Sequence, residues 1–168
     1  ELKRRILILG FYRIASSFIA ELERRKSALL EQVFVVDFNP NVYHALQERG
    51  VRVYYNDISN SDSLVHAGLA DAEIVISSVP DSLLKGTTNE KLVRYVRKVN
   101  PTAKIIATAE ELAETQILYA AGADYVTLAR LDQANELIDV VTAAEAGQLA
   151  DLKAKLDAQL RDRHEILP

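Results

Sequence analysis

The segment Ile6-Leu7-Ile8-Leu9-Gly10-Phe11-Tyr12-Arg13-Ile14-Ala15 decides the fold of this chain of 168 residues. Its four leading aliphatic residues predict a buried strand, Gly10 predicts a tight turn, and apolar residues recur at helical spacing from Ile14 onward. The same succession of a β-branched run and a helical pattern is repeated, and it predicts further strands at 33–37, 52–55, 73–78, 104–108 and 124–127. Such alternation is typical of β-α units around a parallel sheet. We therefore expect an α/β fold with a doubly wound, parallel six-stranded sheet.

The composition excludes several classes of protein. Lys+Arg total 20 against 24 Asp+Glu, so the net charge of −4 provides no general basic field for nucleic acid. No apolar run approaches the ~20 residues that cross a bilayer. The absence of cysteine excludes disulfides, thiolate nucleophiles and Cys-ligated metals. Because the chain also lacks methionine and begins at Glu1, we expect it to be a piece of a longer protein.

The C-terminal part differs in pattern from the rest. From Leu131 to about Arg163 there is no proline, the only glycine is Gly147, and leucines recur at helical or heptad-like intervals. This pattern predicts one long helix of about 30 residues, about 45 Å in length, following a domain at 1–130. Either its first half packs on the sheet and the rest frays, or its apolar stripe pairs with another helix. We favour self-association through the 131–168 extension.

The turn at Gly10 carries an incomplete glycine-rich fingerprint for dinucleotides, in the strand-to-helix context where that motif is meaningful. Gly10 supplies the first glycine, and Ala15 is a tolerated substitute for the third. Tyr12 occupies the second position, where bare backbone normally allows the pyrophosphate to approach. Its ring is expected to push phosphates outward or to block them.

The other candidate ligand residues lie at the carboxyl ends of the predicted strands, where ligands bind in doubly wound folds. Asp37 is placed to accept hydrogen bonds from ribose hydroxyls, which favours NAD over NADP, or it only caps the Asn39-Pro40 turn. Asp57 and Ser78 either contact adenine and ribose or form turns. Arg13 either offsets phosphate charge or is an exposed helix arginine.

No catalytic or metal-binding arrangement is predicted. The three histidines, His44, His66 and His164, are scattered and lack metal-ligand spacing. The acidic group 110–114 could supply oxygens to a divalent cation, but acidic side chains in the first turn of a helix are ordinarily explained by the helix dipole.

Several separate segments together resemble the KTN or RCK family, TrkA-N-like regulators of K+ conductance. They are Leu9-Gly10-Phe11-x-Arg13-Ile14, Val36-Asp37-Phe38-Asn39-Pro40, Arg49-Gly50-Val51-x-Val53, Asn56-Asp57-Ile58-Ser59, Ile76-Ser77-Ser78-Val79-Pro80-Asp81 and Ala121-Gly122-Ala123-Asp124-Tyr125-Val126. The resemblance covers about residues 5–130. It is nearest to the domains that follow the membrane part of monovalent cation:proton antiporters.

The resemblance implies a Rossmann-like fold that forms a homodimer and binds NAD(H), AMP, ADP or ATP as an effector rather than a substrate. It carries the binding role to Gly10, Arg13, Asp37, Asp57 and Ser78, whereas Tyr12 departs from the pattern at a position that should contact the ligand. It further implies a non-enzymatic regulatory domain at the cytoplasmic face of the membrane. By this resemblance such a domain is expected to gate a K+ or Na+ transporter, the membrane part of the same chain, through ligand-dependent rearrangement of the dimer.

Two alternatives follow from the same residues. In the first, Tyr12 fills the phosphate position, and the protein is a dimerisation module without a ligand. In the second, the chain is the cofactor domain of an NAD-dependent oxidoreductase, although neither a substrate domain nor a proton-transfer residue is visible in it.

Overall fold

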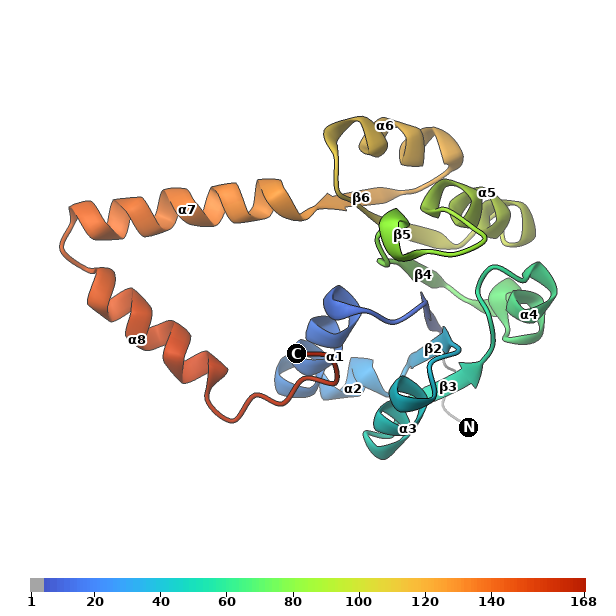
Figure 1. Ribbon diagram of the computed structural model, residues 1–168, viewed down its shortest axis with the longest axis horizontal. Coiled ribbons are helices and arrows are strands. Elements are labelled where there is room, and N and C mark those ends of the chain that lie inside the picture. The colour runs from blue at the N-terminus through green and yellow to red at the C-terminus, as the bar shows by residue number, and fades with distance from the viewer. Residues whose placement is uncertain (1–4) are drawn as a thin grey trace.

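A computed structural model describes residues 5–168 and contains one six-stranded parallel sheet (Figure 1). The strand order is β3-β2-β1-β4-β5-β6, which confirms the predicted doubly wound architecture. Central strand β1 pairs on one side with β2 and on the other with β4, so that Leu9 lies opposite both Val36 and Ser77. The strands are β1 (Ile6–Leu9), β2 (Val33–Asp37), β3 (Arg52–Tyr55), β4 (Ile74–Ser77), β5 (Lys104–Ala109) and β6 (Tyr125–Leu128).

Helices cover both faces of the sheet. The connections are α1 (Arg13–Arg25), α2 (Ser27–Leu30), α3 (Pro40–Glu48), α4 (Ser61–His66), α5 (Asn89–Val99) and α6 (Leu112–Ala121), with short 3-10 turns η1 (Leu69–Asp71) and η2 (Asp81–Leu83). Because neighbouring side chains of a strand point to opposite faces, Ile6 and Ile8 pack with α1 and α3, whereas Leu7 and Leu9 pack with α4, α5 and α6. These four side chains are 0–3% exposed, which explains why β1 is an unbroken aliphatic run.

The prediction of one continuous C-terminal helix is wrong. The structure has two helices, α7 (Ala129–Glu145) and α8 (Leu149–Leu160), separated at Gly147, whose φ is +71°. The backbone N–H groups of Gly147 and Gln148 donate to carbonyls in the last turn of α7, which ends that helix. A left-handed conformation is easily adopted by glycine, so the chain reverses there at little cost. The first half does not pack on the sheet either, because α7 has no buried residue.

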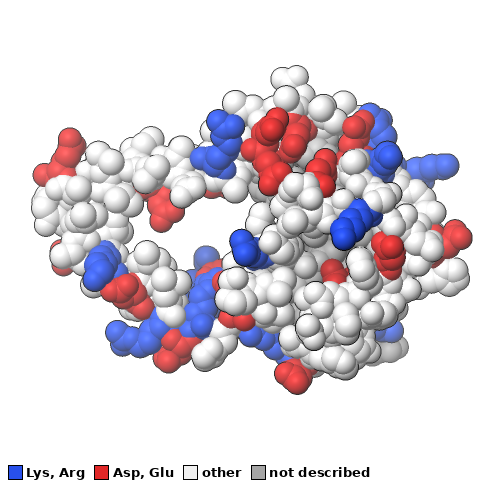
Figure 2. Space-filling view, viewed as in Figure 1, with Lys and Arg blue, Asp and Glu red and all other residues white. Residues whose placement is uncertain are grey.

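The end of the chain packs against α1 and does not fray. The Leu167 N–H donates to the Ser16 hydroxyl over 2.9 Å, and Ile166 and Leu167 join the hydrophobic cluster beneath α1. Arg163 pairs with Glu21 of α1 and with Glu165, and hydrogen bonds from Arg24 and Arg163 lower the pKa of Glu21 to about 2. Helices α7 and α8 therefore form an arm fastened at both ends, and Figure 2 shows an opening between this arm and the rest of the molecule.

Within residues 5–168, no helix is both long and apolar enough to cross a membrane.

Candidate functional site

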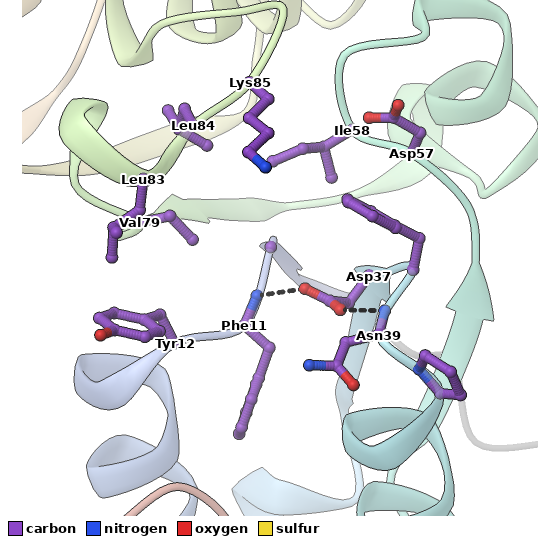
Figure 3. A pocket seen from close by; sticks show the side chains of 13 residues that line it. Phe11, Tyr12, Asp37, Asn39, Asp57, Ile58, Val79, Leu83, Leu84 and Lys85 are labelled. Atoms are coloured by element: carbon purple, nitrogen blue, oxygen red, sulfur yellow. Dashed lines mark hydrogen bonds between the residues drawn. The ribbon is translucent and has the colours of Figure 1, made fainter.

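A cavity of about 590 Å³ lies at the carboxyl ends of β1 and β2 and beside the loop that follows β4 (Figure 3). Its volume is in the range of small-molecule and cofactor sites. Four residues predicted from the sequence line it, namely Gly10, Tyr12, Asp37 and Asp57. The position is the switch point of the sheet, where the chain connections turn to opposite sides and leave a crevice.

Gly10 forms the turn that the sequence predicted. Its φ is +73°, and its N–H donates to the Val36 carbonyl over 2.8 Å. A Cβ atom at this position would lie 2.8 Å from Val79 Cγ2 and 3.1 Å from Ile58 Cδ1. Both the backbone conformation and the close packing therefore require glycine.

Asp37 joins the two turns at the edge of the cavity. Its Oδ2 accepts a hydrogen bond from the Phe11 N–H at 2.8 Å, and its Oδ1 accepts one from the Asn39 N–H at 2.7 Å. The predicted capping role in the Asn39-Pro40 turn is thus present. A carboxylate has further lone pairs, so these bonds leave capacity for ribose hydroxyls. Burial raises the pKa of Asp37 above its usual value, and the hydrogen bonds from Asn39, Phe11 and Phe38 oppose that rise.

Tyr12 borders the cavity and does not fill it. In Figure 3 its ring lies on the same side of the cavity as Val79 and Leu83, away from Asp37. The Arg13 guanidinium lies 5.5 Å from the centre of this ring, as in a cation–π contact, and Arg13 does not line the cavity.

Ser78 is not brought to the cavity either. It is 2% exposed, and its hydroxyl has no hydrogen-bond partner among the described residues. The side-chain hydrogen bond at this strand end comes from its neighbour, because the Ser77 hydroxyl donates to Asn89 Oδ1 over 2.6 Å. Asn89 in turn donates to the Val79 carbonyl and to Asp81, which fastens the loop between β4 and α5.

Sequence reasoning missed the residues that complete the lining. Phe38, Ile58 and the segment Leu83–Lys85 also contribute to the wall. The sequence signal that could have identified Phe38 is an aromatic residue directly after Asp37, the acid that closes the strand. In the structure the Phe38 side chain is 55% exposed. The sequence predicted the start of the loop after β4 at this rim through Ser78, but no motif marked Leu83–Lys85 as part of the wall.

The acidic group after β5 is explained by local structure. The Glu110 N–H donates to Glu114 Oε2 over 2.9 Å, across the start of α6. Within the part of the chain that the structure describes, no set of three or more His, Asp or Glu side chains is arranged to hold a metal ion.

Comparison with known proteins identifies the family. The TrkA-N domain matches this chain over residues 6–129, which includes the whole sheet and the cavity. The chain belongs to the TrkA-N domain family. The resemblance to KTN and RCK domains is thereby confirmed, and this TrkA-N domain is related to proteins of potassium transport.

Three relatives describe this relationship. The glutathione-regulated potassium-efflux system protein KefC of Escherichia coli O157:H7 is 31% identical over 93 residues, which are 55% of this chain and 14% of KefC. The GsuK channel bound to NAD is 28% identical, with a TM-score of 0.61 over 76% of this chain and 22% of the channel chain. A GsuK structure bound to ADP has the same identity and TM-score over 76% of this chain and 32% of that chain. The TrkA-N domain of the inner membrane protein ybaL from Escherichia coli shares the fold, with 23% identity and a TM-score of 0.71 over 83% of this chain and 98% of that domain. The chain thus spans about one seventh of the length of the curated relative it matches.

Proposed function

We propose that this TrkA-N domain binds NAD(H), AMP, ADP or ATP as a regulatory effector and acts on a K+ or Na+ transporter without catalysing a reaction. The observation that carries the proposal is the open cavity at the switch point, where Gly10 forms the turn and Asp37 forms the acidic edge. The binding of NAD and ADP by GsuK supports it.

The cavity suits an adenosine moiety. We expect Asp37 to accept hydrogen bonds from the ribose hydroxyls, and Phe38 and Ile58, which also line the cavity, to contact the base. Asp57 borders the same part of the cavity, and its Oδ1 already accepts a hydrogen bond from the Ser59 N–H at 2.8 Å. Arg13 and Ser78 stay proposed contacts that require movement on binding.

Ligand binding is expected to raise the melting temperature. At a nucleotide concentration ten times the dissociation constant, linkage contributes about 1.4 kcal/mol, or roughly 3–5 °C for a domain of this size. Differential scanning fluorimetry with NAD, NADH, AMP, ADP and ATP measures the shift, with inorganic phosphate as the control. An unchanged melting temperature with all five at millimolar concentration would refute the ligand, and a gain of binding by Tyr12→Gly would then identify Tyr12 as a plug.

The arm formed by α7 and α8 is the proposed dimer contact. It presents large apolar side chains that are 46–64% exposed, which monomeric proteins rarely gather on one element. They are Leu131, Leu137, Ile138, Val141, Leu149, Leu156 and Leu160. A second copy of the 131–168 extension would cover this surface with a surface of the same kind.

Charge reversal on the arm tests this contact. We expect the double substitution Ile138→Glu and Val141→Glu to weaken the dimer by at least about tenfold, because each change places a charge in an apolar interface. Glu136→Lys and Asp139→Lys on the same helix form the matched control, and sedimentation velocity measures the oligomeric state. A wild-type protein that is monomeric at high concentration would contradict the proposed homodimer.

The proposed place of the domain is the cytoplasmic face of the cell membrane, attached to a cation:proton antiporter. A nucleotide changes transport only if it binds two arrangements of the dimer with different affinity. Transport measured in vesicles with the nucleotide added on the domain side tests this step.

A further inference from the structure

The loop that connects η2 to α5 carries one lysine toward the cavity. Lys85 lines the cavity wall together with Ile58, and Figure 3 shows its side chain extending away from the loop. Among the described residues, no carboxylate or carbonyl pairs with this ammonium group. Its charge is therefore available to a bound molecule.

The lining of the cavity contains two acidic side chains and one basic side chain. Asp37 and Asp57 are the acids of the lining; Asp37 accepts hydrogen bonds from two backbone N–H groups and Asp57 from one. Within the described lining, Lys85 is the only cation, since the Arg13 guanidinium is stacked near the Tyr12 ring outside it. An anionic group that enters this cavity thus meets repulsion from the carboxylates on the β2 and β3 side, and among the charged side chains of the lining only Lys85 attracts it.

The loop is anchored at its base and carries Lys85 near its tip. The Asn89 N–H donates to Asp81 Oδ1 over 2.8 Å, and Asn89 Nδ2 donates to the Val79 carbonyl over 2.7 Å, so both ends of the loop are tied together. Gly86, with φ +75°, allows the turn directly after Lys85. The fixed base and the long flexible side chain hold the ammonium group within reach of the cavity while allowing adjustment to a ligand.

We propose that Lys85 binds the phosphate groups of the nucleotide and makes affinity depend on their number. Tyr12 occupies the position at which bare backbone would contact the phosphates, so in this chain the phosphate path is displaced from the first turn toward the loop after β4. This assignment rests on the proposed function, because it concerns the same cavity. It adds a specificity: affinity rises from adenosine through AMP and ADP to ATP.

Titration calorimetry with adenosine, AMP, ADP and ATP tests the assignment on wild type, Lys85→Gln, Lys85→Arg and Lys98→Gln. Lys98 is an exposed lysine of α5 outside the cavity lining and serves as the matched control. A charge-assisted bond to phosphate predicts about tenfold weaker ATP binding by Lys85→Gln, adenosine binding within twofold of wild type, and partial retention of ATP by Lys85→Arg. Lys85→Gln should also flatten the dependence of ATP binding on salt.

The outcomes are separable. If wild type binds the nucleotides and Lys85→Gln binds ATP equally well, or loses adenosine and ATP in equal measure, the role of Lys85 is overturned while the proposed function stands. If wild type binds none of the four, the role of Lys85 is overturned, and the melting test with NAD and NADH then decides whether the proposed function stands. Equal losses in Lys85→Gln and Lys98→Gln would show a general charge effect and would also overturn the assignment.

Discussion

Replacing Gly10 by alanine is expected to lower the free energy of unfolding by about 3 kcal/mol. About 1–2 kcal/mol comes from placing a side chain on a backbone with φ of +73°. The remainder comes from overpacking, because the new Cβ would lie 2.8 Å from Val79 Cγ2 and 3.1 Å from Ile58 Cδ1. Urea denaturation measures the change.

Gly50→Ala provides the matched control. Gly50 has nearly the same φ, +74°, but an added Cβ meets nothing within 4 Å, so only the conformational cost of about 1–2 kcal/mol applies. The difference between the two variants isolates the packing at the turn. Equal losses would mean that Val79 and Ile58 yield freely and that the turn is not closely packed.

The same pair separates stability from binding. Gly10→Ala forces Val79 and Ile58 apart, and both line the cavity, so we expect nucleotide affinity to fall as well. Gly50 lies outside the cavity lining, and Gly50→Ala should bind as wild type does at a temperature where both are folded.

Asp37→Asn is expected to weaken the binding of adenosine and of every adenine nucleotide by about tenfold or more. The reason is that an amide replaces the charged acceptor for the ribose hydroxyls, and hydrogen bonds to charged groups contribute about 1.5–3 kcal/mol. The loss should be the same for adenosine and ATP, unlike the charge-dependent loss expected for Lys85→Gln. Circular dichroism checks that the variant folds, since the amide has one acceptor oxygen and one of the backbone N–H groups of Phe11 and Asn39 therefore loses its acceptor.

The pH dependence of binding follows from the ionisation of Asp37. Only the charged carboxylate accepts all of these bonds, so affinity is full above the pKa of Asp37 and is lost as pH falls through it. Because burial raises this pKa above 3.8, the loss begins at a higher pH than for an exposed aspartate. The folded protein holds the proton more tightly than the unfolded chain, so the contribution of Asp37 to stability decreases as pH rises through the same pKa. Calorimetry of wild type and Asp37→Asn across this range checks both signs, and a parallel pH profile in Asp37→Asn would assign the titration to another group.

Much of the fold could be predicted because it is locally encoded. The run at β1 is aliphatic throughout and the run at β2 is apolar up to Val36, a pattern typical of strands buried on both faces. Pro40 and Asn39 mark the start of α3, and the structure has Pro40 as its first residue with the Asn39 side chain as its N-cap. Differences at strand ends amount to a residue or two, since β4 runs from Ile74 to Ser77 and β6 from Tyr125 to Leu128.

The candidate site could be predicted only in part. Gly10 directly follows β1 and Asp37 is the last residue of β2, so their positions follow from two neighbouring parallel strands. The structure has both in the lining of the cavity, where the Phe11 N–H next to Gly10 donates to Asp37. Lys85 could not be placed, because whether a loop side chain points into a crevice depends on how that loop is anchored elsewhere. Here Asn89 anchors the loop through hydrogen bonds to Asp81 and to the Val79 carbonyl, and no local sequence pattern predicts these bonds.

The sequence by itself determined the parallel sheet, its order of elements and the acidic edge of the cavity, because these follow from burial patterns and from the closing residues of each strand. Tertiary structure alone decided where the C-terminal extension goes. Gly147 is compatible with a helix or with a reversal, and the choice is made by contacts that residues 163–167 form with α1, far away in the sequence. A helical period records which side chains are apolar, but it does not record which distant surface they meet.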